Sequence, residues 1–240
     1  MGTRIKIVIT SLIYFVFFTT FSSHALLYEF NTVISGAVPG GQTPWLTAEF
    51  NDSSQPINGI TISGVLLKLK APNLATIPGK EFVTNWYFNN TLEDTIHDLK
   101  YSSTLSGTAL ALKNYFPVDL NDLNAGTGAK FDVYFQFQTS NKNSGRFENG
   151  DFAEIFLYGV KDLTADSFYA LSTSNDNNKQ YLAEAHIQGI STGAGSAWVV
   201  PSEPVITVQT NPVPEPGSVV LFGVGLLGLA IYIKRRINRQ

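Results

Sequence analysis

The chain has 240 residues, and its 16 Lys and Arg against 19 Asp and Glu give a formal net charge of −3 at pH 7. It contains no cysteine, which excludes disulfides, thiol catalysis and cysteine-ligated metal sites. Its surplus of carboxylates repels phosphate backbones, so we do not expect a nucleic-acid partner.

The first 25 residues have the three parts of a secretory signal. Arg4 and Lys6 form a positive start, residues 7–21 are apolar, and small residues occupy the two positions that a signal peptidase reads. We therefore predict a signal peptide over residues 1–25, with cleavage between Ala25 and Leu26. A retained membrane anchor is the alternative.

Residues 26–201 are predicted to form one exported domain whose apolar residues alternate with a period of two. In the clearest segment, Phe131, Val133, Phe135 and Phe137 share one face. The same pattern predicts strands over 45–50, 59–64, 65–70, 82–88, 108–112, 153–158, 181–190, 196–200 and 205–208.

Two details of these strands are predicted as well. A hairpin turn is expected near Ser63 and Gly64, because glycine favours turns. Alternation within residues 82–88 places Phe82, Trp86 and Phe88 together on one face.

Helix is scarce, with single turns expected only over 92–99 and 163–169. Short strands joined by turn-forming loops predict an all-β fold, an antiparallel β-sandwich of jelly-roll type. A Pro-rich linker is expected to follow the domain over residues 202–212.

Histidines and carboxylates are the candidate metal or catalytic groups of this chain. His97 lies among Glu93, Asp94 and Asp98, which could ligate a divalent cation, but a solvated acidic turn is the preferred interpretation. Residues 119–126 resemble a calcium loop, yet their oxygens do not fall on alternate positions, which favours a turn. We predict no metal and no cofactor.

His186 alternates with Glu184 and Gln188, so the three side chains are expected on one face of a strand. That face is either a polar site or simply the solvated side of the sheet, and we favour the solvated side. The sequence offers no Gly-x-Ser-x-Gly elbow, and residues 193–196 are interpreted as a turn.

Two further groups of side chains suggest sugar chemistry. The carboxylates of Glu148, Asp151 and Glu154 could serve glycosidic acid and base catalysis, although spacing alone does not show it. The tryptophans could stack on sugar rings if exposed, but core positions are favoured; they are Trp45, Trp86 and Trp198. No catalytic residue is predicted, and we do not expect an enzyme.

The C-terminal residues 213–240 have three parts in order. A Pro-rich motif comes first: Val213, Pro214, Glu215, Pro216 and Gly217. An apolar run over 217–233 follows, and its 17 residues would span roughly 25 Å as a helix, near the lower limit for crossing a bilayer. The basic tail 234–240 carries Lys234, Arg235, Arg236 and Arg239. This predicts a transmembrane helix with a cytoplasmic C-terminus.

This three-part arrangement resembles the PEP-CTERM sorting signal of Gram-negative bacteria. The resemblance implies that an exosortase in the inner membrane recognises the Pro-Glu-Pro triplet, cleaves the tail and passes the protein to the cell surface or extracellular matrix. An ordinary single-pass anchor is the alternative. Residues 43–50, 81–88 and 185–189 also resemble uncharacterised ectodomains of this class, which implies no activity.

The exported part alone has 10 Lys and Arg against 18 Asp and Glu, a net charge of −8. Because the resemblance links such proteins to exopolysaccharide-producing bacteria, we expect a structural or adhesive role in a biofilm matrix. A carbohydrate-binding module is the second hypothesis, which exposed coplanar Trp or Tyr would favour. A secreted hydrolase is the third, which a pocket joining His186 to carboxylates would favour.

Overall fold

The computed structural model describes residues 23–75, 81–104, 118–140, 145–173, 179–202, 205–209 and 234–236. Residues 23–209 form one compact unit, and both ends of the chain, residues 1–22 and 210–240, form a second. In the second unit only residues 234–236 are described, and they are helical and exposed. Among all these described residues, none lies in a helix long and apolar enough to cross a membrane. The predicted transmembrane helix over 217–233 lies outside them.

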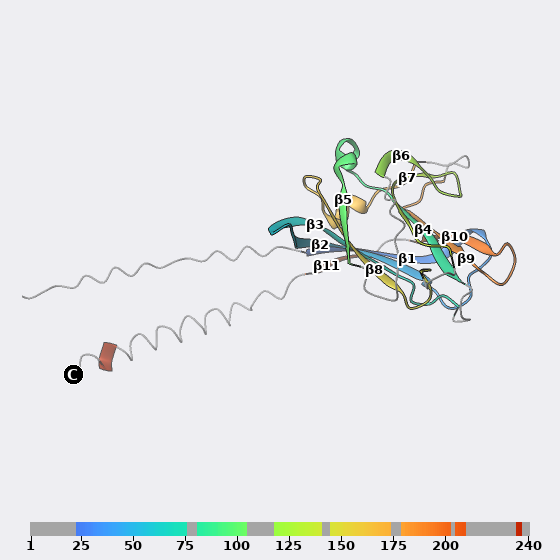
Figure 1. The fold of residues 1–240 in the computed structure, drawn as a ribbon, viewed down its shortest axis with the longest axis horizontal. Coiled ribbons are helices and arrows are strands. Elements are labelled where there is room, and N and C mark those ends of the chain that lie inside the picture. The colour runs from blue at the N-terminus through green and yellow to red at the C-terminus, as the bar shows by residue number, and fades with distance from the viewer. Residues whose placement is uncertain are drawn as a thin grey trace, which may run out of the picture. The chain divides into compact units, whose positions relative to one another are not determined.

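Strands are the main regular structure of the compact unit (Figure 1). In chain order they are β1 (Ser23–Gly36), β2 (Leu46–Ile57), β3 (Ile60–Lys70), β4 (Phe82–Phe88), β5 (Lys100–Thr104), β6 (Val118–Asn124), β7 (Lys130–Gln136), β8 (Phe152–Tyr158), β9 (Ala183–Gln188), β10 (Ser196–Pro201) and β11 (Val205–Gln209). Two short 3₁₀ helices, η1 (Glu93–Asp98) and η2 (Ala165–Phe168), fall where helical turns were predicted. Paired strands are antiparallel, which confirms the predicted all-β, antiparallel class.

The strands form one continuous sheet in the order β5-β8-β3-β2-β1-β10-β9-β4-β7-β6, with β11 also paired to β1. This sheet curls over itself into a half-barrel, so the two layers expected of a sandwich are halves of one sheet. Phe50 of β2 and Phe88 of β4 show the closure, because their ring centroids lie 5.1 Å apart although three strands separate them in the sheet order.

The curl is centred on β1, which changes partners along its length. Its first half pairs with β2 and β11, and its second half pairs with β10. The pairing with β10 shifts register between Phe30 and Thr32 and again between Val33 and Ser35. Because such bulges bend and twist a strand, they allow the sheet to turn here and bring its two halves face to face.

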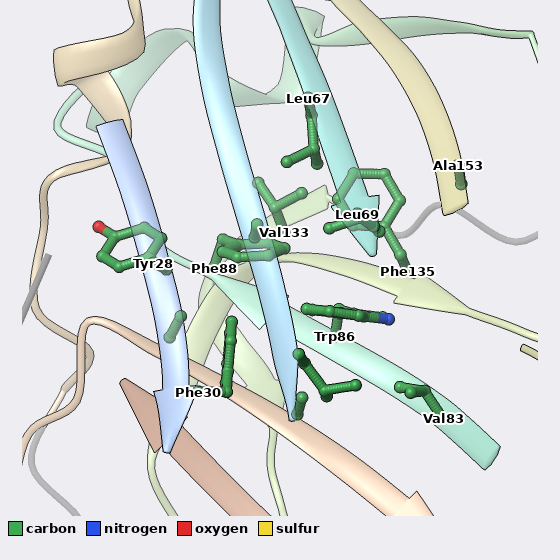
Figure 2. Close-up of a cluster of buried hydrophobic side chains, with 14 of the residues drawn as sticks. Tyr28, Phe30, Leu67, Leu69, Val83, Trp86, Phe88, Val133, Phe135 and Ala153 are labelled. Carbon is green, nitrogen blue, oxygen red and sulfur yellow. The ribbon is translucent and has the colours of Figure 1, made fainter. Parts of the chain in front are cut away.

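The enclosed core is mainly aromatic and aliphatic. In Figure 2, side chains from β1, β3, β4 and β7 converge on one volume; Tyr28, Leu67, Phe88 and Phe135 are among them. Trp86 lies in the same cluster and packs edge-on against Phe30, with 5.2 Å between ring centroids. Because the core draws on both halves of the sheet, its burial holds the half-barrel closed.

Three strands were not predicted: β1, β5 and β6. Strand β1 overlaps the predicted signal peptide at residues 23–25, and its alternating residues Leu26, Tyr28 and Phe30 are fully buried. The strand predicted over 108–112 lies outside the described residues. Strand β11 confirms the strand expected over 205–208, so the stretch predicted as a linker contains a paired strand.

The predicted position of the hairpin turn is wrong. Strands β2 and β3 are joined by Asn58 and Gly59, whose φ angles of 51° and 80° correspond to a two-residue type I′ turn. Ser63 and Gly64, where the turn was expected, lie inside β3 and pair with β2.

A bulge in β4 explains a second correction. The pairing of β4 with β9 shifts register between Val83 and Asn85, and Val83 rather than Phe82 joins Trp86 in the main core. Phe82 is buried elsewhere, with the Arg146 guanidinium 3.9 Å from its ring centroid.

Strand β7 departs from the predicted alternation at one end. Val133, Phe135 and Phe137 lie in the main core as expected. Phe131 is also buried, but it belongs to a second cluster that includes Tyr87. Tyr87, a member of this second cluster, lines the site described next.

Candidate functional site

Strand β9 has an apolar face toward the core and a polar face on the outer side of the sheet. Ala183, Ala185 and Ile187 lie in the main core, so Glu184, His186 and Gln188 project from the opposite, outer face. This confirms that the three polar side chains share one face. Glu184 is fully buried, however, so the face is not simply a solvated side.

Neighbouring strands bring further side chains to this face. Trp198 of β10 pairs with His186 on one side, and Asn85 of β4 pairs with it on the other. Gln136 of β7 pairs in turn with Asn85. Together with Gln188 these residues line a cleft of about 370 Å³, which we call the outer cleft.

Trp198 and His186 form one wall of the outer cleft. Their rings are nearly parallel, with 4.4 Å between centroids and 13° between planes. Thr84, the bulged residue of β4, places its Oγ1 3.0 Å from His186 Nδ1 and donates to the His186 carbonyl oxygen at 3.3 Å. Burial lowers the pKa of His186, so the imidazole is neutral near pH 7.

The turn after β6, residues 125–129, closes over this wall. It is fixed by backbone hydrogen bonds from Ala125 to Ala129 and from Gly128 to Ala125, both 3.1 Å. Gly126 lies so close to the indole that a Cβ there would come within 2.1 Å of Trp198 Cε2. Only glycine therefore fits at this position without displacing the ring or the turn.

Glu184 lies beneath the 125–129 turn. Its Oε1 accepts a 2.6 Å hydrogen bond from Thr127 Oγ1, while its Oε2 is buried and has no hydrogen-bond partner among the described residues. Burial raises the pKa of Glu184 to about 7, and the Thr127 hydrogen bond only partly opposes this. A neutral carboxyl is thus readily available at this position.

The base of the outer cleft is aromatic. Tyr87 packs against Tyr134, Phe131 and Trp198 with centroid separations of 4.7, 5.7 and 5.9 Å. Tyr134 also donates a 3.3 Å hydrogen bond to Asn85 Oδ1. Burial raises the pKa of the Tyr87 phenol, which keeps it protonated. The base is therefore rigid and uncharged.

Three amide side chains around the outer cleft are available for a ligand. Asn124 ends β6, Gln136 lies on β7 and Gln188 lies on β9. Within the described part of the chain, none of the three makes a side-chain hydrogen bond. Each offers one acceptor and two donor positions.

Most of the other predicted sites have structural roles. Asp151 accepts from the Glu148 backbone N–H at 2.7 Å and so fixes a turn, and Glu154 pairs with Lys68 across β8 and β3 at 3.2 Å. His97 and Asp98 are exposed on η1. The side chains of their neighbours Glu93 and Asp94 lie outside the described residues.

The calcium-like stretch 119–126 forms β6 and the beginning of the following turn. Asp122 lies 3.5 Å from Lys130, and the Asn121 backbone N–H donates to the buried Asp132 at 2.7 Å. The side chain of Asp119 lies outside the described residues.

The tryptophans divide between core and cleft. Trp45 and Trp86 are 5% and 0% exposed and belong to the main core, as favoured from sequence. Trp198 is half-buried at the outer cleft instead. Residues 193–195 form the predicted turn, closed by a 3.1 Å hydrogen bond from the Ile190 N–H to the Gly195 carbonyl, and Ser196 begins β10.

The export-related residues fall in both units. Ala25 and Leu26 are buried within β1, where they pair with β2 and β11. Lys234, Arg235 and Arg236 are exposed. The remaining residues of the predicted sorting motif and basic tail lie outside the described residues: Val213, Pro214, Glu215, Pro216, Gly217 and Arg239.

Sequence reasoning identified the β9 residues but not the cleft they help to line. Trp198, Asn85 and Gln136 come from three other strands, so only the sheet order brings them together. Their sequence does indicate that these three side chains face away from the core, because each lies next to core residues of its own strand and side chains alternate between the two faces.

Comparison with protein families gives one match: residues 212–236 correspond to the PEP-CTERM protein-sorting motif. Neither the curated proteins nor the solved structures contain a match to this chain. The match covers the Pro-Glu-Pro triplet, the apolar run and the first basic residues, and it confirms the predicted sorting motif. The chain is therefore an exported protein that an exosortase sorts to the cell envelope or surface.

Proposed function

We propose that this exosortase-sorted protein serves a structural or adhesive role in an extracellular polysaccharide matrix. The observation that carries the proposal is the sorting motif at residues 212–236, placed directly after a compact β-sheet unit over 23–209. One folded domain followed by a sorting signal is the arrangement expected of a protein that acts outside the cell.

The proposed partners are an exosortase and, during transit, the inner membrane. We expect the prolines around Glu215 to disfavour a helix, which would hold Glu215 out from the membrane where a protease can reach it. The apolar run over 217–233 would hold the protein in the membrane until cleavage, with the basic tail on the cytoplasmic side.

The geometry around His186 favours adhesion over hydrolysis. The imidazole contacts Thr84 and Trp198, and the buried carboxyl on the same strand, Glu184, bonds Thr127 beneath the 125–129 turn. The outer cleft instead presents amides and an aromatic wall, which suits recognition of a polar ligand. A carbohydrate-binding module is therefore the second candidate function.

The sorting step is tested by replacing Pro214, Glu215 and Pro216 with alanine in a host that carries the exosortase. We expect full-length protein to accumulate in the membrane fraction, because the protease no longer recognises its site. Pro204→Ala, upstream in the same Pro-rich stretch, is the matched control and should be processed normally. Unchanged release and unchanged mass of the triple variant would contradict the proposal.

The matrix role is tested with the full-length protein and the host's own exopolysaccharide. We expect the two to co-sediment, and we expect a strain lacking the gene to retain less polysaccharide at its surface. If the protein stays in the supernatant and the deletion strain keeps its matrix unchanged, the structural or adhesive role is wrong.

A further inference from the structure

The outer cleft is lined by neutral groups. Among its described lining residues are amides, hydroxyls, a phenol, an indole and the His186 imidazole, and none is Asp, Glu, Lys or Arg. Glu184, which comes two residues before His186 on β9, is buried and bonded to Thr127 of the 125–129 turn. Among the lining residues, a charged ligand would find no opposite charge to offset its loss of hydration; Arg146, which donates to the Thr139 carbonyl oxygen at 2.9 Å, is not one of them. The lining therefore suits an uncharged, polar ligand.

The three available amides define how such a ligand would be held. Asn124, Gln136 and Gln188 come from β6, β7 and β9, so their donors and acceptors converge from three elements. A sugar hydroxyl both donates and accepts hydrogen bonds. A side-chain amide can bond to it in either role, because the amide oxygen accepts and the NH₂ group donates. Convergent amides are thus matched to a ligand that carries several hydroxyls.

The aromatic wall supplies the apolar part of the site. Trp198 is half-buried and kept in place by the parallel His186 ring and by Gly126. The Tyr87 cluster supports the wall from below. Because strands and packed rings already fix these groups, binding would require little ordering of the protein.

Size and long-range charge narrow the ligand class further. The cleft volume of about 370 Å³ falls within the range of about 300 to 1,000 Å³ typical of small-ligand sites. The exported part carries a net charge of −8, which repels polyanions such as uronic-acid polymers or nucleic acids.

We propose that the outer cleft binds an uncharged saccharide through the amides of Asn124, Gln136 and Gln188 against the wall formed by Trp198 and His186. This inference deepens the proposed matrix role and rests on it for the source of the ligand, which would be a segment of a neutral exopolysaccharide.

The test measures binding of neutral gluco-, manno- and galacto-oligosaccharides to full-length protein purified in detergent, by titration calorimetry and tryptophan fluorescence. Trp45 and Trp86 are buried in the core, so a ligand-induced fluorescence change should report Trp198 and disappear in Trp198→Phe. We expect saturable binding of at least one neutral oligosaccharide, and no binding of an oligogalacturonate.

Single amide replacements locate the site. Gln188→Ala and Asn124→Ala should each weaken binding at least about tenfold, since each removes hydrogen-bonding groups that the ligand would contact. Gln55→Ala is the matched control, because Gln55 is also a half-buried strand glutamine but lies on β2. Unchanged circular dichroism of each variant excludes misfolding as the cause of a loss.

Two results would overturn the proposal: no binding of any neutral oligosaccharide, or equal effects of the cleft and control variants. Oligogalacturonate binding as tightly as the neutral sugars would overturn the assigned ligand class. Because these measurements use purified protein, they do not depend on sorting. The alanine replacement of Pro214-Glu215-Pro216 tests sorting in cells, so the two failures are distinguishable.

Discussion

The indole of Trp198 lies parallel to the imidazole of His186, with 4.4 Å between their ring centroids. The two residues are cross-strand partners on β10 and β9, so the pairing of these strands sets the stack. The stack also shields one side of the imidazole from water. This arrangement connects the protonation of His186 to the integrity of the cleft wall.

We therefore predict that Trp198→Ala raises the pKa of His186 toward its ordinary value of about 6.5, because removing the indole hydrates the ring. In the parent protein burial lowers the pKa of His186. The measurement is an NMR titration of the imidazole C–H resonances, with His97→Gln used to assign them. An identical titration midpoint in parent and variant would show that the stack does not desolvate His186.

Glu184 predicts a pH dependence of stability, because burial shifts its pKa in the opposite direction to that of His186. Burial raises its folded-state pKa from 4.5 to about 7, so between these values the folded protein binds the proton more tightly than the unfolded chain does. The associated stability is fully present below pH 4.5 and is lost as pH rises toward 7. A difference of this size corresponds to roughly 3 kcal/mol.

Glu184→Gln should remove this loss, since the amide stays neutral and can still accept from Thr127. We expect the variant to unfold at higher denaturant concentration than the parent at pH 8, and at nearly the same concentration at pH 4.5. Glu154→Gln serves as the control, because its ion pair with Lys68 is partly exposed and worth at most about 1 kcal/mol. A variant that is less stable than the parent at pH 8 would contradict the predicted burial cost.

The contact between Gly126 and Trp198 gives a steric prediction. A Cβ at position 126 would come within 2.1 Å of the indole, so Gly126→Ala must move either the 125–129 turn or the ring. We expect a loss of about 1 to 3 kcal/mol in unfolding free energy. Trp198 should also become more accessible to acrylamide quenching. Quenching and stability that match the parent would mean that the turn does not hold the indole.

Closure of the half-barrel depends on Phe50. Its ring packs against Phe88 at 5.1 Å and against Phe168 of η2 at 4.4 Å, which joins β2 to the opposite half of the sheet. Phe50→Ala should lower the unfolding free energy by about 3 to 5 kcal/mol in denaturant titrations. Ile60→Ala is the control, since Ile60 is 68% exposed and its loss should cost no more than about 0.5 kcal/mol. Equal costs for the two variants would contradict the central role of Phe50.

Local patterns predicted individual strands well. The bounds of β4 match the predicted 82–88, because its aromatic and β-branched residues are bounded by polar and turn-forming ones. The assignment of faces within it failed, since the bulge at Thr84 depends on β9 and leaves no trace in the alternation. The turn at Asn58 and Gly59, in contrast, has a signal in the dipeptide itself, because Asn-Gly is the preferred pair of a type I′ turn.

The outer cleft could not be predicted from one sequence. Glu184 and His186 were correctly placed on one face, but burial of Glu184 requires the 125–129 turn, which lies more than fifty residues away in the chain. Trp198 was expected in the core by analogy with other tryptophans. Its position depends on the single sheet, which places β10 beside β9 and not in a separate layer.

The predicted signal-peptide cleavage site lies within the part of β1 that pairs with β11, so cleavage would change this part of the sheet. Strand β11 pairs with Ser23–Leu27, and the predicted signal-peptide cleavage after Ala25 removes the partners of Thr207, Val208 and Gln209. Only Ile206 and Val205 would keep their partners in the mature protein. We therefore predict that residues 207–209 become loosely held after cleavage, which frees the stretch leading to the sorting motif.

Hydrogen exchange followed by mass spectrometry tests this on two preparations, the cleaved protein and a Ser23→Phe variant that resists the signal peptidase. Ser23 is the other small residue of the predicted cleavage site, and it is replaced instead of Ala25 because Ala25 is buried in the sheet. Backbone amides of residues 207–209 should exchange faster in the cleaved protein, because they lose partners in the sheet. Peptides from β10 serve as the internal control, since their partners in Phe30–Gly36 remain after cleavage. Equal exchange at 207–209 in both preparations would contradict the prediction, because it means that cleavage leaves the pairing of β1 with β11 as it was. A mature N-terminus other than Leu26 would also contradict it, because a different part of β1 would then be removed.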